Sequence, residues 1–205
     1  LAFFPIMLIP IFEADASSNL NLFVSAENSQ FDNTFSGSMV VEVVIRDSNL
    51  SDTDEGKGEP DVTINGKILR MVQATDGNWY AYFANVEKAK IADSTVGLAG
   101  KGLDFGEFCS RDTATSVFGV SLSETDGFAI PRPGSVTGST NGISSFSECT
   151  SSPSNTSNTN NVVRNAKSIN TNSNVSVGQI GLDADAWPLI QLYSFDDVII
   201  EYNPG

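Results

Sequence analysis

The chain contains no histidine among its 205 residues. Histidine is the usual general base at neutral pH, a common ligand of transition metals and the base of most serine and cysteine triads. Its absence excludes those arrangements and predicts that the chain is not an enzyme. Catalysis by a pair of carboxylates, as in glycoside hydrolases, is the catalytic alternative that stays open.

Basic residues are also scarce. The chain has 11 Lys and Arg against 25 Asp and Glu, which gives a formal net charge of -14. Binding to nucleic acid or to an anionic lipid surface requires clustered Lys and Arg, so neither is expected as a partner. An excess of carboxylates attracts cations, and cations are therefore the small partners that we expect.

Cysteine occurs only twice, at Cys109 and Cys149. An even number of cysteines in an exported chain predicts a disulfide. This bridge closes a loop of about 40 residues and contributes on the order of 4 kcal/mol if it constrains the unfolded chain. Two unpaired thiols are the alternative.

Apolar runs are too short to span a bilayer, which takes about 20 residues. The apolar run 1–12 is followed by an Ala-x-Ala pattern at residues 14–16. This order is typical of a secretory signal peptide, here without its initial Met and basic segment. We expect residues 1–16 to be a truncated signal peptide and residues 17–205 an exported domain with no membrane insertion of its own. A buried first strand is the alternative for residues 1–12.

The remaining pattern is that of short strands separated by tight turns. Asn65-Gly66 and Asp76-Gly77 join β-rich runs and are strong hairpin signals, so we expect a three-stranded meander over 61–64, 67–74 and 78–84. Residues 85–93 are the one short helix expected. The pattern predicts an all-β chain, an antiparallel Ig-like β-sandwich, with two smaller β domains as the alternative. Residues 132–161, rich in Ser, Thr and Asn, are expected to be a long loop insertion.

Acidic residues are concentrated between Arg46 and Ile64. They are Asp47, Asp52, Asp54, Glu55, Glu59 and Asp61. Calcium takes six to eight oxygen ligands, often several from one loop, so the six acids are a candidate calcium site. An EF-hand loop that begins at Asp52 is excluded, because its twelfth position requires an acid and is occupied by Thr63. The alternative is a solvated acidic loop that forms an anionic surface without a bound ion.

Three N-x-[ST] sequons occur, at Asn49, Asn155 and Asn174. In an exported protein these are candidate glycan acceptors on surface loops. The first lies inside the acidic stretch and the second inside the Ser/Asn-rich insertion.

Several segments resemble the N-terminal region of the major surface-layer (S-layer) protein of ammonia-oxidising archaea. They are VVEVVIRDSNLSDTDEGKGEPDVTINGKILRM (40–71), ATDGNWYAYFANVEKA (74–89), KGLDFGEFCS (101–110) and YSFDDVIIEYNPG (193–205). The resemblance implies a secreted protein of several Ig-like domains that self-associates into a two-dimensional lattice on the cell surface. It also implies an acidic, ammonium-enriching lattice held by calcium, and a subunit that continues beyond residue 205.

The sequence thus supports two classes of function. The first is a structural constituent of an archaeal S-layer, acidic, cation-attracting and calcium-stabilised. The second is a secreted calcium-dependent adhesin or carbohydrate-binding β-sandwich, which would use an exposed aromatic residue such as Trp79 or Trp187 beside a carboxylate.

Overall fold

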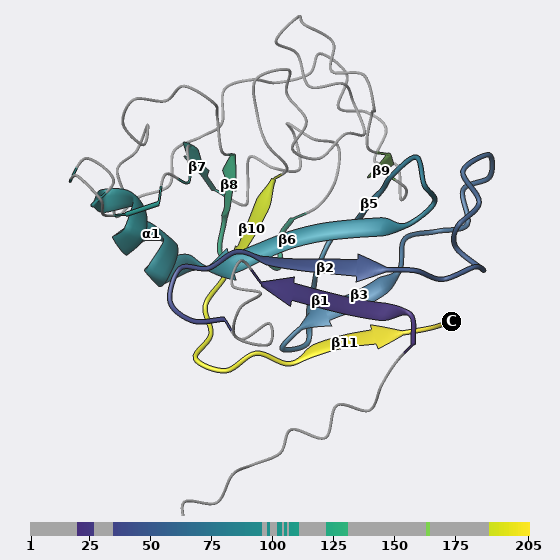
Figure 1. Ribbon diagram of the computed structural model, residues 1–205, viewed down its shortest axis with the longest axis horizontal. Coiled ribbons are helices and arrows are strands. Elements are labelled where there is room, and N and C mark those ends of the chain that lie inside the picture. Colours follow the sequence, from purple (N-terminus) through teal and green to yellow (C-terminus); the bar gives the residue numbers. More distant parts are fainter. Residues whose placement is uncertain are drawn as a thin grey trace, which may run out of the picture.

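The computed structural model of the chain describes residues 20–26, 35–95, 98, 102–103, 105, 107–110, 122–130, 163–164 and 189–205. These residues form an all-β, sandwich-like fold with one short helix (Figure 1), which confirms the predicted fold class. The expected signal peptide (1–16) and the expected insertion (132–161) lie outside these residues. The Ig-like strand order and the choice between one and two domains stay predictions.

Two sheets build the fold. The large sheet follows the order β1 (Leu22–Ala26), β2 (Val41–Ile45), β6 (Trp79–Asn85), β10 (Ile190–Tyr193), β8 (Phe128–Ile130) and β7 (Glu107–Cys109), with β5 (Val72–Gln73) beside β6 and β9 (Val163–Arg164) beside β5. The small sheet follows the order β11 (Ile200–Asn203), β3 (Asp61–Ile64) and β4 (Lys67–Ile68). Figure 1 shows β11 running below β1, and β3 passing behind β1.

The large sheet is mixed. Strands β6 and β10 are parallel, with Tyr82 opposite Ile190, and β5 and β9 are also parallel. The expectation of an antiparallel sandwich holds for the other described pairs but not for these two. Parallel neighbours cannot be joined by a tight turn, and a long connection separates β6 from β10 in the sequence.

Both predicted tight turns are present. Asn65 and Gly66 have positive φ angles of 50° and 78°, which matches the turn that joins strands in two-residue hairpins. At the second turn Gly77 has φ 84°, and the backbone N–H of Ala74 donates to the carbonyl of Asn78 at 2.9 Å. Local backbone preference therefore determined both turns.

The predicted strand 67–74 is split between the sheets. Its first part, β4, pairs with β3 in the small sheet, and its last part, β5, pairs with β6 in the large sheet. Between them Leu69 and Met71 are fully buried, because this segment crosses the core from one sheet to the other. The expected three-stranded meander is therefore wrong: it is two hairpins in two sheets.

The main core lies between the sheets. It joins Val41, Val43 and Ile45 of β2 to Val62 and Ile64 of β3, all essentially unexposed. These residues alternate along their strands, as they must to share one face of a sheet. Trp79, Phe83 and Tyr193 add large aromatic side chains to the same core.

Helix α1 (Val86–Ser94) covers part of the other face of the large sheet. It begins at Asn85, whose Oδ1 accepts a hydrogen bond from the backbone N–H of Lys88 at 3.0 Å, a standard N-terminal cap. Val86 and Ala89 pack in a second core with Ile190 and Leu192 of β10. The helix expected over 85–93 is thus confirmed to within one residue.

Candidate functional site in the acidic loop

The acidic loop, residues 47–61, connects β2 of the large sheet to β3 of the small sheet. Its six carboxylates differ sharply in exposure. Asp47 is 6% exposed, Glu59 is largely buried, Asp52 is half-buried, and Asp54, Glu55 and Asp61 are exposed. The loop therefore holds acids of two kinds, which its sequence alone did not distinguish.

Asp47 joins the two sheets. Its Oδ2 accepts hydrogen bonds from the Tyr202 hydroxyl at 2.6 Å and from Asn21 Nδ2 at 3.2 Å, and its Oδ1 accepts from the backbone N–H of Asn49 at 2.9 Å. Tyr202 lies on β11, so this carboxylate ties β2 to the small sheet. The Tyr202 hydrogen bond, supported by the Asn49 N–H, holds the pKa of Asp47 below its ordinary value.

Glu59 forms the other buried contact. Its two oxygens meet Arg70 Nη2 at 2.6 Å and Nε at 2.9 Å, and its Oε1 also accepts from the backbone N–H of Met71 at 2.6 Å. Burial raises the pKa of Glu59, while the Arg70 hydrogen bond and charge oppose that shift. Glu59 thus fixes the segment that crosses between the sheets to the end of the acidic loop.

The middle of the loop is closed on itself. Asp52 Oδ1 accepts from the backbone N–H groups of Asp54 at 2.8 Å and Glu55 at 3.3 Å, an Asx-type turn. Glu55 pairs with Lys57 at 2.5 Å, and both side chains are substantially exposed. At the far end Asp61 accepts from Asn203 Nδ2 at 3.2 Å.

Gln73 holds the acidic loop onto the large sheet. This residue is 2% exposed, and its Nε2 lies 3.1 Å from the carbonyl oxygens of both Leu50 and Asp52. Trp79 Nε1 also donates to the Leu50 carbonyl, at 3.0 Å. Gln73 Oε1 is buried without a hydrogen-bond partner, so the amide N–H groups account for the polar contacts that keep this side chain inside.

Replacing Gln73 by leucine is expected to lower the free energy of unfolding by about 1–2 kcal/mol, because the loop carbonyls lose their buried donor. The loop should also open locally, and trypsin should then cut after Lys57 faster than in the parent protein. Limited proteolysis followed by mass spectrometry measures this. Tyr80→Phe, which removes a hydrogen bond to Asp76 in a neighbouring turn, is the control and should leave cleavage unchanged. Equal cleavage rates for Gln73→Leu and the parent would contradict the role of Gln73.

Two of the six predicted calcium ligands, Asp47 and Glu59, have protein partners. The oxygens of Asp47 and Glu59 face protein donors, and Glu59 is matched by a guanidinium. Within the part of the chain that the structure describes, no group of three or more Asp, Glu, Cys or His side chains is placed to hold a metal ion. Calcium binding by the acidic loop stays a prediction.

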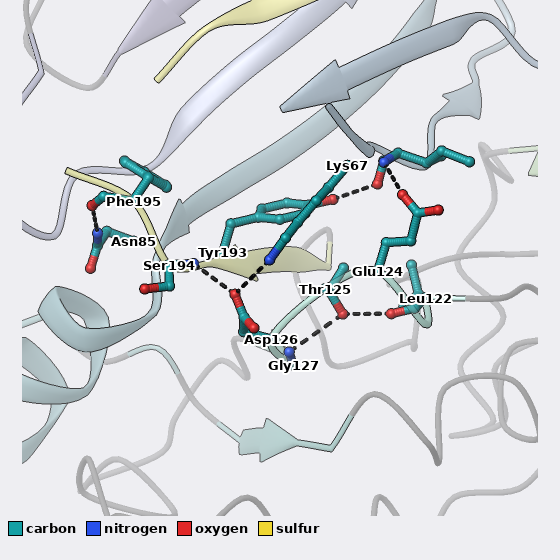
Figure 2. Close-up of polar contacts among 11 residues, drawn as sticks. Lys67, Asn85, Leu122, Glu124, Thr125, Asp126, Gly127, Tyr193, Ser194 and Phe195 are labelled. Carbon is teal, nitrogen blue, oxygen red and sulfur yellow. Dashed lines mark hydrogen bonds and ion pairs between the residues drawn. The ribbon is translucent and has the colours of Figure 1, made fainter. Parts of the chain in front are cut away.

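A second polar cluster, which the sequence did not single out, lies between β4 and β10 (Figure 2). Asp126 Oδ2 accepts from the Ser194 backbone N–H at 2.7 Å and lies 3.5 Å from Lys67 Nζ. Glu124 accepts from the backbone N–H of Ile68. Figure 2 shows these side chains converging from the turn before β8 on the small-sheet hairpin. The available signal was the Asp126-Gly127 pair, which is typical of a turn but does not identify the strand it contacts.

The remaining predicted sites have different outcomes. Asn49 is exposed in a turn at the start of the acidic loop, as a glycan acceptor must be. Cys109 is buried and disulfide-bonded, but Cys149 lies outside the described residues, so their pairing stays a prediction. Asn155, Asn174 and Trp187 also lie outside them. Trp79 is 1% exposed and packs in the core, so it cannot stack on a sugar.

Comparison with known proteins adds no family. No protein-family model matches the chain, and no curated protein matches it significantly. Among the helices of the described residues, none is long and apolar enough to cross a membrane. The fold and the site geometry therefore carry the functional argument.

Proposed function

We propose that the chain is a non-catalytic structural domain of an extracellular surface-layer lattice, like that of ammonia-oxidising archaea. It self-associates with other copies and presents an acidic, cation-attracting surface. The observation that carries the proposal is the distribution of charge: 25 acids against 11 bases, with Asp54 and Glu55 exposed on the connecting loop and Asp61 exposed at the start of β3. The all-β sandwich-like fold supports it, because packed sheets form rigid units and a surface lattice is built from rigid units.

The buried acids support the structural reading in a second way. Asp47 and Glu59 are used to join β2, β11 and the segment before β5. Carboxylates engaged in this manner stabilise the fold. The exposed acids of the same loop are the ones that face solvent cations.

Cation attraction by these acids is local. The Debye length is about 8 Å at physiological ionic strength and below about 5 Å at marine salt concentrations, so steering over long distances is weak. Enrichment of ammonium or another monovalent cation then requires carboxylates of neighbouring copies that confine the ion between them.

Electron cryotomography of cells labelled with antibodies against this chain tests the proposal. Labels should lie outside the cell and follow the repeat of a two-dimensional lattice. Labelling inside the cell, or on the surface without periodic order, would contradict it. Surface labelling without order, combined with binding to glycans, would instead support the adhesin alternative.

Calcium is tested separately. Replacing both Asp52 and Asp54 by asparagine is expected to weaken calcium binding by about tenfold, equivalent to about 1.4 kcal/mol, and to reduce lattice order. Asparagine keeps a side-chain oxygen for the Asp52 turn, so the loop should retain its shape. Isothermal titration calorimetry measures the binding, with the double variant Glu87→Gln and Glu201→Gln at exposed positions outside the loop as the matched loss of two charges. An unchanged affinity and stoichiometry would exclude calcium from this loop.

A further inference from the structure

Strand β1 ends the large sheet. It pairs with β2 on one side, and among the described strands none pairs with its other side. An edge strand presents unpaired backbone N–H and C=O groups, which form a template for a strand of another molecule. Most proteins protect such edges with charged residues, prolines or bulges.

Both terminal strands of the small sheet are protected in this way. Each carries a charged residue, Lys67 in β4 and Glu201 in β11. In β4 the carboxylate of Glu124 also takes the backbone N–H of Ile68. Strand β1, Leu-Phe-Val-Ser-Ala, has no charged residue, proline or glycine, although the chain as a whole is rich in acids.

The β1 edge is also apolar and open. Phe23 is 44% exposed and Val24 is 36% exposed. Val24 lies opposite Val43, which is fully buried, so Val24 points to the core side of the sheet and the flank of the core is uncovered there. Phe23 lies on the other face, where the Arg46 guanidinium stacks 4.7 Å from its ring centre.

The hydrogen-bond pattern shows which backbone groups face outward. The Arg46 N–H donates to the Asn21 carbonyl at 2.9 Å, so Asn21 directs its backbone groups toward β2. In an antiparallel pair this direction alternates along the strand. Leu22, Val24 and Ala26 therefore direct their N–H and C=O groups away from β2, and Val24 is the centre of this set.

We propose that β1 is a self-association edge, where the β1 strands of two copies pair antiparallel about a two-fold axis at Val24. This rests on the proposed function, which requires contacts between copies. A two-fold pair places identical surfaces together, and two strongly acidic copies can approach closely at a strand that carries no charge of its own. The charged groups beside it, Glu42 at Ser25 and Arg46 at Phe23, are of opposite sign. Val24 then opposes Val24 of the second copy, with Leu22 opposite Ala26, and about six backbone hydrogen bonds extend the large sheet across both molecules.

A cysteine at Val24 tests the register in the full-length protein. Across the two-fold axis the two Cα atoms should be about 5.5 Å apart, so Val24→Cys should give a covalent dimer with a short bifunctional thiol reagent. Glu201→Cys places an exposed thiol on β11, an edge strand of the small sheet, and is the control. Dimer from Val24→Cys but not from Glu201→Cys supports the pairing, and equal yields from both variants, or none from Val24→Cys, would overturn it.

A proline at Val24 tests the hydrogen bonds. The Val24 N–H faces away from β2, and proline is tolerated where an edge N–H faces solvent, so the monomer should keep its melting temperature. Self-association measured by sedimentation should weaken by about tenfold or more, while Val24→Thr should associate like the parent. If Val24→Pro melts normally and associates normally, the edge is not the interface.

The two proposals fail separately. Periodic surface labelling in cells whose protein gives no Val24→Cys dimer would leave the lattice function standing and reject the β1 interface. A Val24→Cys dimer from a protein that never labels the cell surface would support the edge pairing and reject the lattice function.

Discussion

Replacing Arg70 by alanine is expected to lower the free energy of unfolding by about 3 kcal/mol at pH 7. Glu59 and Arg70 form a two-pronged ion pair with side chains only 13% and 17% exposed. Removing the guanidinium leaves a largely buried carboxylate without its countercharge, which is costlier than the pair itself is stabilising. Chemical denaturation followed by tryptophan fluorescence measures the loss, since Trp79 is buried in the core.

The pH dependence identifies the cause of that loss. Burial already raises the pKa of Glu59 in the folded protein, and without Arg70 the folded pKa rises further. A carboxyl whose folded pKa lies above its unfolded pKa favours folding as it takes up a proton, so the deficit of Arg70→Ala should shrink as the pH falls. Glu59→Gln keeps an acceptor for Met71 and Arg70 and should be destabilised less. A deficit that is constant with pH would show that lost packing of Arg70 is the cause.

Replacing Asp47 by alanine is expected to cost about 2–3 kcal/mol, because the Tyr202 hydroxyl and the Asn49 N–H lose a charged acceptor. Tyr202→Phe removes one of these contacts and should cost less, about 1–2 kcal/mol. Chemical denaturation at pH 7 measures both losses. If Tyr202→Phe costs as much as Asp47→Ala, the loss comes from the tyrosine and not from the carboxylate.

Acid should remove the same contribution from the parent protein. The folded pKa of Asp47 lies below its unfolded value, so its stabilisation is complete above the unfolded pKa and is lost as the pH falls through the folded pKa. Asp47→Ala should therefore approach the stability of the parent in strong acid. The folded pKa of Asp47 is lowered and that of Glu59 is raised, so their contributions to stability depend on pH in opposite directions although both acids belong to one loop.

The sequence predicted those parts of the fold that local preferences decide. The Asn65-Gly66 turn could be predicted because this pair accepts positive φ angles. Helix α1 begins directly after Asn85, a residue that caps a helix well. The interruption of the predicted strand 67–74 at Leu69 to Met71 could not be predicted from the sequence. An apolar segment that crosses the core and an apolar strand have the same composition. Which sheet receives β5 depends on packing between distant parts of the chain.

The acidic loop shows the same division. Its position between two strands was predictable, and so was the turn at Asp52, which uses neighbours two and three residues away. The partners of Asp47 and Glu59 were not, because Tyr202 is 155 residues from Asp47 and the Arg70 pair depends on the crossing segment. Six acids close together in the sequence suggested one ion site, because sequence proximity does not show which of them are buried against partners from other strands.

The Asn65-Gly66 turn has a consequence for chemical ageing. Asn-Gly is the dipeptide most prone to deamidation, since the unhindered glycine nitrogen attacks the asparagine side chain and ammonia leaves. Here Asn65 Nδ2 donates to the Asp197 carbonyl at 2.9 Å, and its Oδ1 accepts from the Ile199 N–H at 2.8 Å. The side-chain amide must break both bonds before it can react. The contacts that join the segment before β11 to the hairpin therefore also slow deamidation at this turn.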